Sequence, residues 1–380
     1  MAGVPLLPAD VLLSKRVQEM VLNGEEPPHL YVCREGDATQ EVSSTLSSIP
    51  IIDFSLLSTS APSTKQEEEE VLEQLRSALC SWGCFQAIGH GISSSLLDEI
   101  HQVAREFFQQ PMEEKKKYAK GVADFEGYGA DPVPEEGQPL DWSDRLFLDA
   151  YPEDRRKPKL WPESPPSFRN VLEEYTVKMK KFTETVSKAM AKSLSLEENC
   201  FLNQFGERGP LQARFNYYSC SERPDLVLGL KSHADGSGYT VILQDDVEGL
   251  QILKDNQWFT VPTISDALLV LMGDQMEIMT NGVFQSPVHR VVTNSERERI
   301  SVAMFYTPEP NKEIGPEDGL VNQERPKIFN KVKDYADIHW EYYQRGTRAL
   351  HVAKVCQIMR GDTREDKEDM RKFRNNTTSL

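Results

Sequence analysis

The chain has no long apolar run and no excess of positive charge. Nowhere in its 380 residues do about 18 consecutive apolar side chains occur, the length that a membrane-spanning helix needs. Lysine and arginine total 43 against 60 aspartates and glutamates, so the formal net charge is −17. Because a strongly negative protein repels phosphate backbones and acidic lipid surfaces, we expect neither a nucleic-acid nor a membrane partner.

Cysteine is scarce, and its spacing carries no motif. The six cysteines are scattered and none belongs to a CxxC pair, so a zinc ribbon or a thioredoxin-type motif has no support. We expect these thiols to be reduced and mostly buried, which is typical of a cytoplasmic protein. Prolines and Asp10 interrupt the apolar residues at the N-terminus, so no signal peptide is expected. A small molecule is the expected partner, and a monomer the expected state.

The N-terminal half is predicted to be mainly helical. We expect a helical arm over 1–47 and a helical and mixed region over 48–200, packed on a core that follows it. Within the mixed region the patterns favour strands at 49–54 and 84–88, helices at 67–82, 94–118 and 165–197, and a loop at 121–141.

The pattern changes after residue 210. Glycine, aspartate, asparagine and proline separate short β-rich runs at 212–218, 239–243, 250–253, 258–261, 268–272, 288–292 and 300–306. Such regular spacing predicts a sandwich or barrel. The expected fold class is therefore mainly β with helical wrapping. The core would span 201–310, and 311–380 would hold one long helix, at about 332–359, and a polar tail.

Two histidines and an aspartate form the most informative pattern. In an extended segment His233 and Asp235 would point to the same side, and His289 follows in a later strand. An isolated H-x-D pair is more often a hydrogen-bonded surface feature. His289, however, shares a strand face with Val291, so it should point inward, where a buried histidine needs partners. Two imidazoles and one carboxylate are the ligands of mononuclear Fe(II) centres that keep coordination positions open.

A second polar group lies on two other predicted strands. Arg299 and Ser301 share one strand face, as do Asn216 and Tyr218. A guanidinium can hold a carboxylate through two hydrogen bonds, and a hydroxyl adds a further donor. Arg299 could instead be an exposed cation among its charged neighbours. Taken with the histidines, these residues predict a site for a dicarboxylic co-substrate.

A further H-x-[DE] match occurs at His339 and Glu341. It lies in a predicted helix, where residues two apart point about 200° away from each other. Both side chains could not readily reach one ion, so we predict that this pair is not a metal site.

In this order the motifs resemble those of the plant soluble 2-oxoglutarate- and Fe(II)-dependent dioxygenases of specialised metabolism, which include flavonol synthase and alkaloid O-demethylases. The resemblance runs from about residue 48 to residue 356. The matching blocks are Ile49-Pro50-Ile51-Ile52-Asp53-Phe54, Trp82-Gly83-Cys84-Phe85-Gln86, Gly89-His90-Gly91, Asn216-Tyr217-Tyr218, His233-x-Asp235, Gly273-Asp274-Gln275, Ser286-Pro287-Val288-His289-Arg290-Val291 and Arg299-x-Ser301.

The resemblance implies a double-stranded β-helix, or jelly roll, as the core. It implies that iron binds to His233, Asp235 and His289. The distal carboxylate of 2-oxoglutarate would pair with Arg299 and Ser301, with Tyr218 and Asn216 nearby. Asp274 and Gln275 are interpreted as a turn between core strands.

Four further residues are candidates for the substrate pocket. Relatives use the position of Phe305 to stack an aromatic substrate, and Arg214 lies two residues before Asn216 on the same strand face. Arg145 and Phe147 match a pocket-lining segment. The alternative is that the two phenylalanines are core residues and that the two arginines form salt bridges.

The resemblance implies an oxidoreductase that uses Fe(II), 2-oxoglutarate and O₂, with ascorbate supporting activity. Its substrate would be a phenylpropanoid, flavonoid, alkaloid or terpenoid, changed by hydroxylation, O-demethylation, desaturation or ring closure. A hormone-modifying dioxygenase is one alternative. A metal-dependent hydrolase and a non-catalytic binding protein are others, but a zinc hydrolase gives no reason for Arg299 and Ser301.

Overall fold

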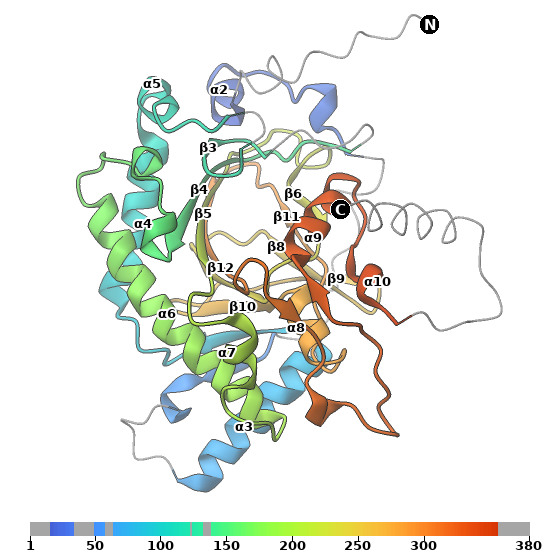
Figure 1. Ribbon diagram of the computed structural model, residues 1–380. Coiled ribbons are helices and arrows are strands. Elements are labelled where there is room, and N and C mark those ends of the chain that lie inside the picture. The colour runs from blue at the N-terminus through green and yellow to red at the C-terminus, as the bar shows by residue number, and fades with distance from the viewer. Residues whose placement is uncertain (1–15, 34–48, 58–63, 122–123, 132–137, 356–380) are drawn as a thin grey trace, which may run out of the picture.

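Two β-sheets form the centre of the molecule (Figure 1). The computed structural model describes residues 16–33, 49–57, 64–121, 124–131 and 138–355. The larger sheet has the order β1 (Ile51–Asp53), β2 (Cys84–Ile88), β10 (Leu268–Met272), β7 (Tyr239–Gln244), β12 (Arg299–Tyr306), β5 (Leu211–Tyr218), β4 (Asp144–Tyr151) and β3 (Gly127–Gly129). The smaller has the order β6 (Leu228–His233), β11 (His289–Val292), β8 (Leu250–Lys254) and β9 (Gln257–Thr260).

The two sheets enclose an apolar layer. Leu230, Ile252 and Val291 of the smaller sheet belong to one buried cluster with Ile242 and Ala303 of the larger sheet. Successive side chains of a strand point to opposite faces of its sheet, so one face of each sheet contributes to this layer. The predicted jelly-roll core is confirmed, and it also takes in β1 to β4 from the 48–200 region.

Helices cover the outer face of the larger sheet. They are α3 (Lys65–Ser81), α4 (Ser94–Gln109), α6 (Phe168–Ser193) and α7 (Cys200–Phe205), and they share one buried cluster with the strands (Figure 1). Thr64 begins α3 with a capping box, because its hydroxyl accepts from the amide of Glu67 and the Glu67 carboxylate accepts from the Thr64 amide. None of the helices in the described ranges combines the length and hydrophobicity that crossing a bilayer requires.

Several predicted boundaries differ from the structure. The helix expected over 94–118 breaks at Pro111, so that α4 is followed by a separate α5 (Met112–Lys116), because proline disfavours a helical residue before it. β4 and β6 were not predicted; the Gly, Lys and Ser of β6 have low strand propensity. In the described part of the 1–47 arm, α2 (Val17–Leu22) packs Val17 into a small apolar cluster.

The single long helix predicted near the C-terminus is wrong in its described part. The chain forms β14 (Val332–Lys333), α9 (Tyr335–Gln344) and α10 (Leu350–Ala353), while residues 356–359 lie outside the described ranges. Gly346, with a φ of +65°, lies just beyond the end of α9, where a left-handed residue commonly ends a helix. Through Tyr343, α9 contacts His233 at the end of β6, and Figure 1 shows α9 away from α4 and α6.

Shorter elements complete the described part of the chain. They are α8 (Asp274–Met279), β13 (Glu313–Ile314), and the 3₁₀ helices η1 (His29–Tyr31), η2 (Phe54–Leu57), η3 (Glu153–Arg155), η4 (Pro158–Leu160) and η5 (Asp318–Leu320). β13 pairs with β14 outside the two main sheets.

Candidate active site

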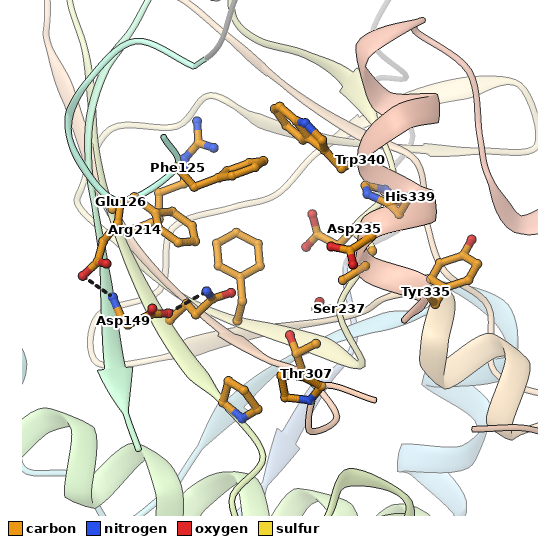
Figure 2. Close-up of a pocket in the computed structure, with 18 of the residues that line it drawn as sticks. Phe125, Glu126, Asp149, Arg214, Asp235, Ser237, Thr307, Tyr335, His339 and Trp340 are labelled. Carbon is orange, nitrogen blue, oxygen red and sulfur yellow. Dashed lines mark hydrogen bonds between the residues drawn. The ribbon is translucent and has the colours of Figure 1, made fainter. Parts of the chain in front are cut away.

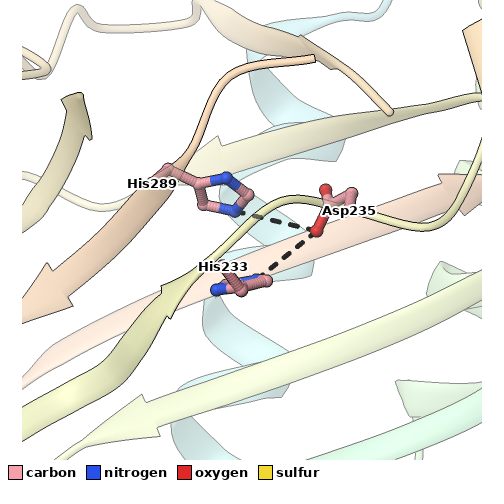
Figure 3. Close-up of side chains that lie close together, drawn as sticks. All are labelled: His233, Asp235 and His289. Carbon is pink, nitrogen blue, oxygen red and sulfur yellow. Dashed lines mark ion pairs between the residues drawn. The ribbon is translucent and has the colours of Figure 1, made fainter. Parts of the chain in front are cut away.

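Three potential metal ligands converge at one end of the smaller sheet (Figure 3). His233 ends β6, and His289 begins the antiparallel neighbour β11 directly opposite it. Asp235 follows two residues after the end of β6. Its Oδ1 lies 3.4 Å from Nε2 of His233 and 3.7 Å from Nε2 of His289. The donor atoms of all three lie within 4.8 Å of one another, so one cation could contact them all.

The two imidazoles are oriented for metal binding. Nδ1 of His233 lies 2.8 Å from the carbonyl oxygen of Lys231, and Nδ1 of His289 lies 3.2 Å from that of Pro287. A carbonyl can only accept a hydrogen bond, so each Nδ1 carries the hydrogen and each Nε2 presents a lone pair. A backbone carbonyl that fixes the tautomer in this way is usual around metal-bound histidines. The donor set therefore fits a divalent cation such as Fe(II).

Charge and burial favour the metal-binding protonation states. Burial alone would raise the pKa of Asp235, but His289, His233 and a 2.5 Å hydrogen bond from Thr240 Oγ1 hold that pKa well below its usual range. Burial and the neighbouring His233 lower the pKa of His289 to about 4, although Asp235 acts in the opposite direction. At neutral pH the site therefore offers an ionised carboxylate and a neutral imidazole at these two positions.

The predicted co-substrate residues meet beside this cluster. β12 pairs with β5 so that Arg299 lies opposite Tyr218 and Ser301 opposite Asn216. Asn216 Nδ2 donates to Ser301 Oγ at 3.3 Å, and the Arg299 guanidinium lies 5.1 Å from the centre of the Tyr218 ring. All four side chains are buried. With the three potential ligands they line a small pocket of about 40 Å³.

Arg299 retains one hydrogen-bond donor without an acceptor. Its Nε donates to the carbonyl oxygen of Val247 at 3.0 Å, and its Nη2 to Gln244 Oε1 at 2.8 Å. Nη1 is buried and has no hydrogen-bond partner among the described residues. A buried, unsatisfied guanidinium N–H is costly. A carboxylate in the small pocket would supply the missing acceptor, so the residues present fit a dicarboxylic co-substrate.

A larger cavity of about 600 Å³ adjoins the small pocket (Figure 2). Both are lined by Arg214, His233, Asp235 and Phe305, so the ligand cluster lies where they meet. The wall of the larger cavity is rich in aromatic side chains. They include Phe125, Phe147, Phe305, Trp340 and Tyr343.

The four predicted pocket residues all line the larger cavity. The rings of Phe147 and Phe305 lie 6.1 Å apart. Arg145 and Arg214 both form ion pairs with Asp131, at 2.8 Å and 2.9 Å. Each of the two arginines therefore lines the cavity and is also ion-paired.

Several residues around the cavity were not predicted as part of the site. Asp131 follows β3 in the expected loop, and His339, Trp340 and Tyr343 lie on α9. His339 lies outside the ligand cluster, but its Nε2 lies 2.8 Å from the carbonyl oxygen of Ala234, between two of the potential ligands. No local pattern in the sequence indicates these contacts, because they depend on how α9 packs against β6.

The interpretation of Asp274 and Gln275 as a turn is wrong. These residues begin α8, and Asp274 is fully buried. Its carboxylate accepts hydrogen bonds from Tyr335 and Arg348. These two residues lie at the ends of residues 335–348, called the C-terminal segment below.

Comparison with known proteins agrees with this geometry. Residues 49–164 match the N-terminal region of non-haem dioxygenases in morphine synthesis, and residues 210–308 match the 2OG-Fe(II) oxygenase superfamily. Codeine O-demethylase from Papaver somniferum is 40% identical over 87% of this chain and 92% of its own length. Protein SRG1 from Arabidopsis thaliana is 39% identical over 86% and 92%.

A solved structure extends the agreement to three dimensions. JOX2, solved in complex with 2OG, Fe and JA, matches with a TM-score of 0.78 and 31% identity over 90% of this chain and 98% of that one. The chain belongs to the 2OG-Fe(II) oxygenase superfamily. It is an oxidoreductase that uses iron and 2-oxoglutarate, as the sequence predicts.

Proposed function

We propose that this enzyme oxidises a C–H bond of a small plant metabolite, with Fe(II) bound by His233, Asp235 and His289. The convergence of these three donors where the two cavities meet is the observation that carries the proposal. The small pocket would hold the co-substrate and the larger cavity the metabolite, so each would reach the metal from its own side.

Arg299 and Ser301 would bind the distal carboxylate of 2-oxoglutarate, with Tyr218 and Asn216 supporting them. The unpaired Nη1 of Arg299 supports this assignment, since a carboxylate would satisfy it. When bound, the iron would supply the activation of O₂, with 2-oxoglutarate as co-substrate, so that one oxygen atom would enter the substrate and the other succinate, with loss of CO₂. The protein positions the metal ligands. The carbonyls of Lys231 and Pro287 orient the imidazoles of His233 and His289, and the Thr240 hydroxyl orients the Asp235 carboxylate.

The substrate would be an aromatic specialised metabolite. Phe305 lines both cavities and lies beside Phe147, which suits stacking against a flat ring system. Relatives named as codeine O-demethylase, thebaine 6-O-demethylase and flavonol synthase support this class. Hydroxylation or oxidative O-demethylation is the proposed outcome, since both begin by placing oxygen on a carbon atom held near the metal.

A hormone-modifying activity is a second candidate because JOX2 was solved with JA. The charge of the cavity favours the first candidate. The buried Arg145 and the half-buried Arg214, which could hold an acidic substrate, are already ion-paired with Asp131. A neutral aromatic molecule would use this wall without breaking an ion pair.

The test is incubation with Fe(II), 2-oxoglutarate, ascorbate and a plant metabolite extract, followed by mass spectrometry. We expect a product that has gained one oxygen atom or lost one methylene group, together with succinate. The His233→Ala and Asp235→Ala variants should form neither. Unchanged turnover in either variant would refute the assignment of the metal ligands.

We also propose that the enzyme is a cytoplasmic monomer that binds neither nucleic acid nor membranes. The net charge of −17 supports this, as do the thiols of Cys80, Cys84, Cys200 and Cys220, which form no disulfide within the described part of the chain. Light scattering during size-exclusion chromatography tests the oligomeric state, and a dimer mass would contradict that part.

A further inference from the structure

Four consecutive carbonyl groups around the potential ligand Asp235 are held by hydrogen bonds. The carbonyl of Asp235 accepts from the Asp274 amide at 2.8 Å, that of Gly236 from Gln275 Nε2 at 2.7 Å, and that of Ser237 from the Gln275 amide at 3.2 Å. These three donors lie at the start of α8. The fourth carbonyl, that of Ala234, accepts from His339 on α9 at 2.8 Å.

The hydrogen bond from His339 reaches the backbone between two of the potential metal ligands. Ala234 lies between the two potential ligands His233 and Asp235, so its carbonyl belongs to the peptide plane that leads into Asp235. Since a carbonyl only accepts, His339 Nε2 must carry the hydrogen and act as the donor. Figure 2 shows His339 projecting from α9 toward Asp235.

The packing of α9 against this segment is close. A Cβ atom on Gly236 would lie 2.4 Å from Cγ of His339, so only glycine allows the imidazole to approach this far. One helical turn further on, the Tyr343 ring meets the His233 ring edge to face, with the centres 5.6 Å apart. Lys231 Nζ lies 4.5 Å from the centre of the same tyrosine ring, and the Lys231 carbonyl holds His233 Nδ1.

The C-terminal segment, residues 335–348, also supports residues 233–237, here called the ligand segment, in an indirect way. Asp274, whose amide holds the Asp235 carbonyl, accepts hydrogen bonds from Tyr335 Oη at 2.7 Å and from Arg348 Nη2 at 2.8 Å. Residues 335–348 therefore reach the ligand segment by two routes. One passes through the start of α8, and the other is the direct bond from His339.

Resting on the proposed iron site, we propose that His339 is a positioning residue for the metal ligands. Its Nε2–H fixes the peptide plane before Asp235 and thereby the direction of the carboxylate toward the two imidazoles. Loss of a group that orients a metal ligand commonly weakens metal binding by about 10- to 100-fold. Because His339 orients the ligand through the backbone, we expect a loss near the lower end, about tenfold.

Two variants separate the hydrogen bond from the shape of the ring. His339→Phe keeps a ring of similar size and removes the donor, whereas His339→Gln keeps a donor and removes the ring. The dissociation constant for Co(II), used as a spectroscopic probe for the divalent site, would be measured by visible absorption. We expect the phenylalanine variant to bind Co(II) about tenfold more weakly with an altered spectrum, and the glutamine variant to stay within about threefold of wild type.

Controls distinguish the outcomes. His351→Phe changes an exposed histidine that hydrogen-bonds only locally, to the carbonyl of Arg348, and should bind Co(II) like wild type. Melting temperatures of the metal-free proteins show whether each variant is folded. If His339→Phe is not, His339→Leu, which also removes the donor, replaces it in the comparison with the glutamine variant.

Wild-type affinity and spectrum in a folded His339→Phe protein would overturn the inference, and so would a tenfold loss in His339→Gln. Failure of the proposed iron site would look different. In that case His233→Ala would bind Co(II) as tightly as the wild-type protein does.

Discussion

Replacing Arg299 with methionine is expected to weaken 2-oxoglutarate binding by about 10- to 100-fold. Two nitrogens of the guanidinium already donate to Val247 and Gln244, whereas Nη1 has no partner among the described residues and is the nitrogen expected to bind the co-substrate. One hydrogen bond between charged partners contributes about 1.5–3 kcal/mol. Since a tenfold change in affinity corresponds to about 1.4 kcal/mol, losing that bond gives the stated range.

A lysine at the same position separates charge from geometry. Arg299→Lys keeps the cation but loses the planar fork, so its affinity for 2-oxoglutarate should lie between those of the wild type and the methionine variant. Anaerobic spectral titration of the Fe(II)-loaded protein with 2-oxoglutarate measures both. Each variant also leaves buried acceptors unpaired, which costs about 1–3 kcal/mol of stability. The free energy of unfolding in urea should therefore be measured first, so that the titrations are done at a temperature at which each variant is folded.

The matched control is Arg297→Met, which removes an exposed arginine that pairs with Asp246 on the surface. It should bind 2-oxoglutarate like the wild type. If Arg299→Met also bound the co-substrate with wild-type affinity, the assignment of the small pocket would be refuted. A loss of metal affinity as large as the loss of 2-oxoglutarate affinity would equally contradict it, because Arg299 should not act on the metal.

Three further changes test separate parts of the site. Thr240→Val removes the hydroxyl that holds the Asp235 carboxylate and should weaken Co(II) binding about tenfold, whereas Thr240→Ser should not. Asp131→Asn leaves the buried Arg145 and the half-buried Arg214 without their counter-charge and should lower the free energy of unfolding in urea by about 3–5 kcal/mol. Trp340→Ala removes an aromatic contact to Phe125, whose ring lies 4.2 Å away, and should raise the KM of the metabolite about three- to tenfold while the affinity for 2-oxoglutarate is unchanged.

Each of these expectations can fail in its own way. Equal Co(II) affinities for the valine and serine variants would show that the hydroxyl does not orient the carboxylate. Wild-type stability of Asp131→Asn would mean that the arginines find other partners. A parallel loss of 2-oxoglutarate affinity in Trp340→Ala would place that side chain nearer to the small pocket than the structure does.

The parts of the site that lie on strands could be predicted from the sequence. Alternation along a strand places Arg299 with Ser301, and Asn216 with Tyr218, and the pairing of β12 with β5 then brings the two pairs together. Such patterns are local and regular. The register that sets Arg299 opposite Tyr218 is not visible in the sequence, but the shared faces already restrict it.

The contacts made by the C-terminal segment could not be predicted in the same way. The sequence of 332–359 favours a helix, but it does not show that the chain turns after α9 near Gly346, nor which face α9 turns toward β6. The partnership of Asp131 with two arginines from other strands is a long-range contact that no spacing indicates. Packing between elements far apart in the sequence decides these features, and local propensity does not predict such packing.

The strands carry the residues for the metal and the co-substrate, whereas the segments around them shape the larger cavity for the substrate. The potential metal ligands and the co-substrate residues lie on or next to four strands, whose ladders fix them against each other. The wall of the larger cavity also draws on the loop before β3 and on α9, which meet through Phe125 and Trp340. Changes in these two segments would alter the shape offered to the substrate and leave the small pocket intact. Because His339 lies on the same helix, however, exchanging the whole of α9 with that of a relative should change metal affinity as well as substrate choice, whereas single changes at Trp340 should change substrate choice alone.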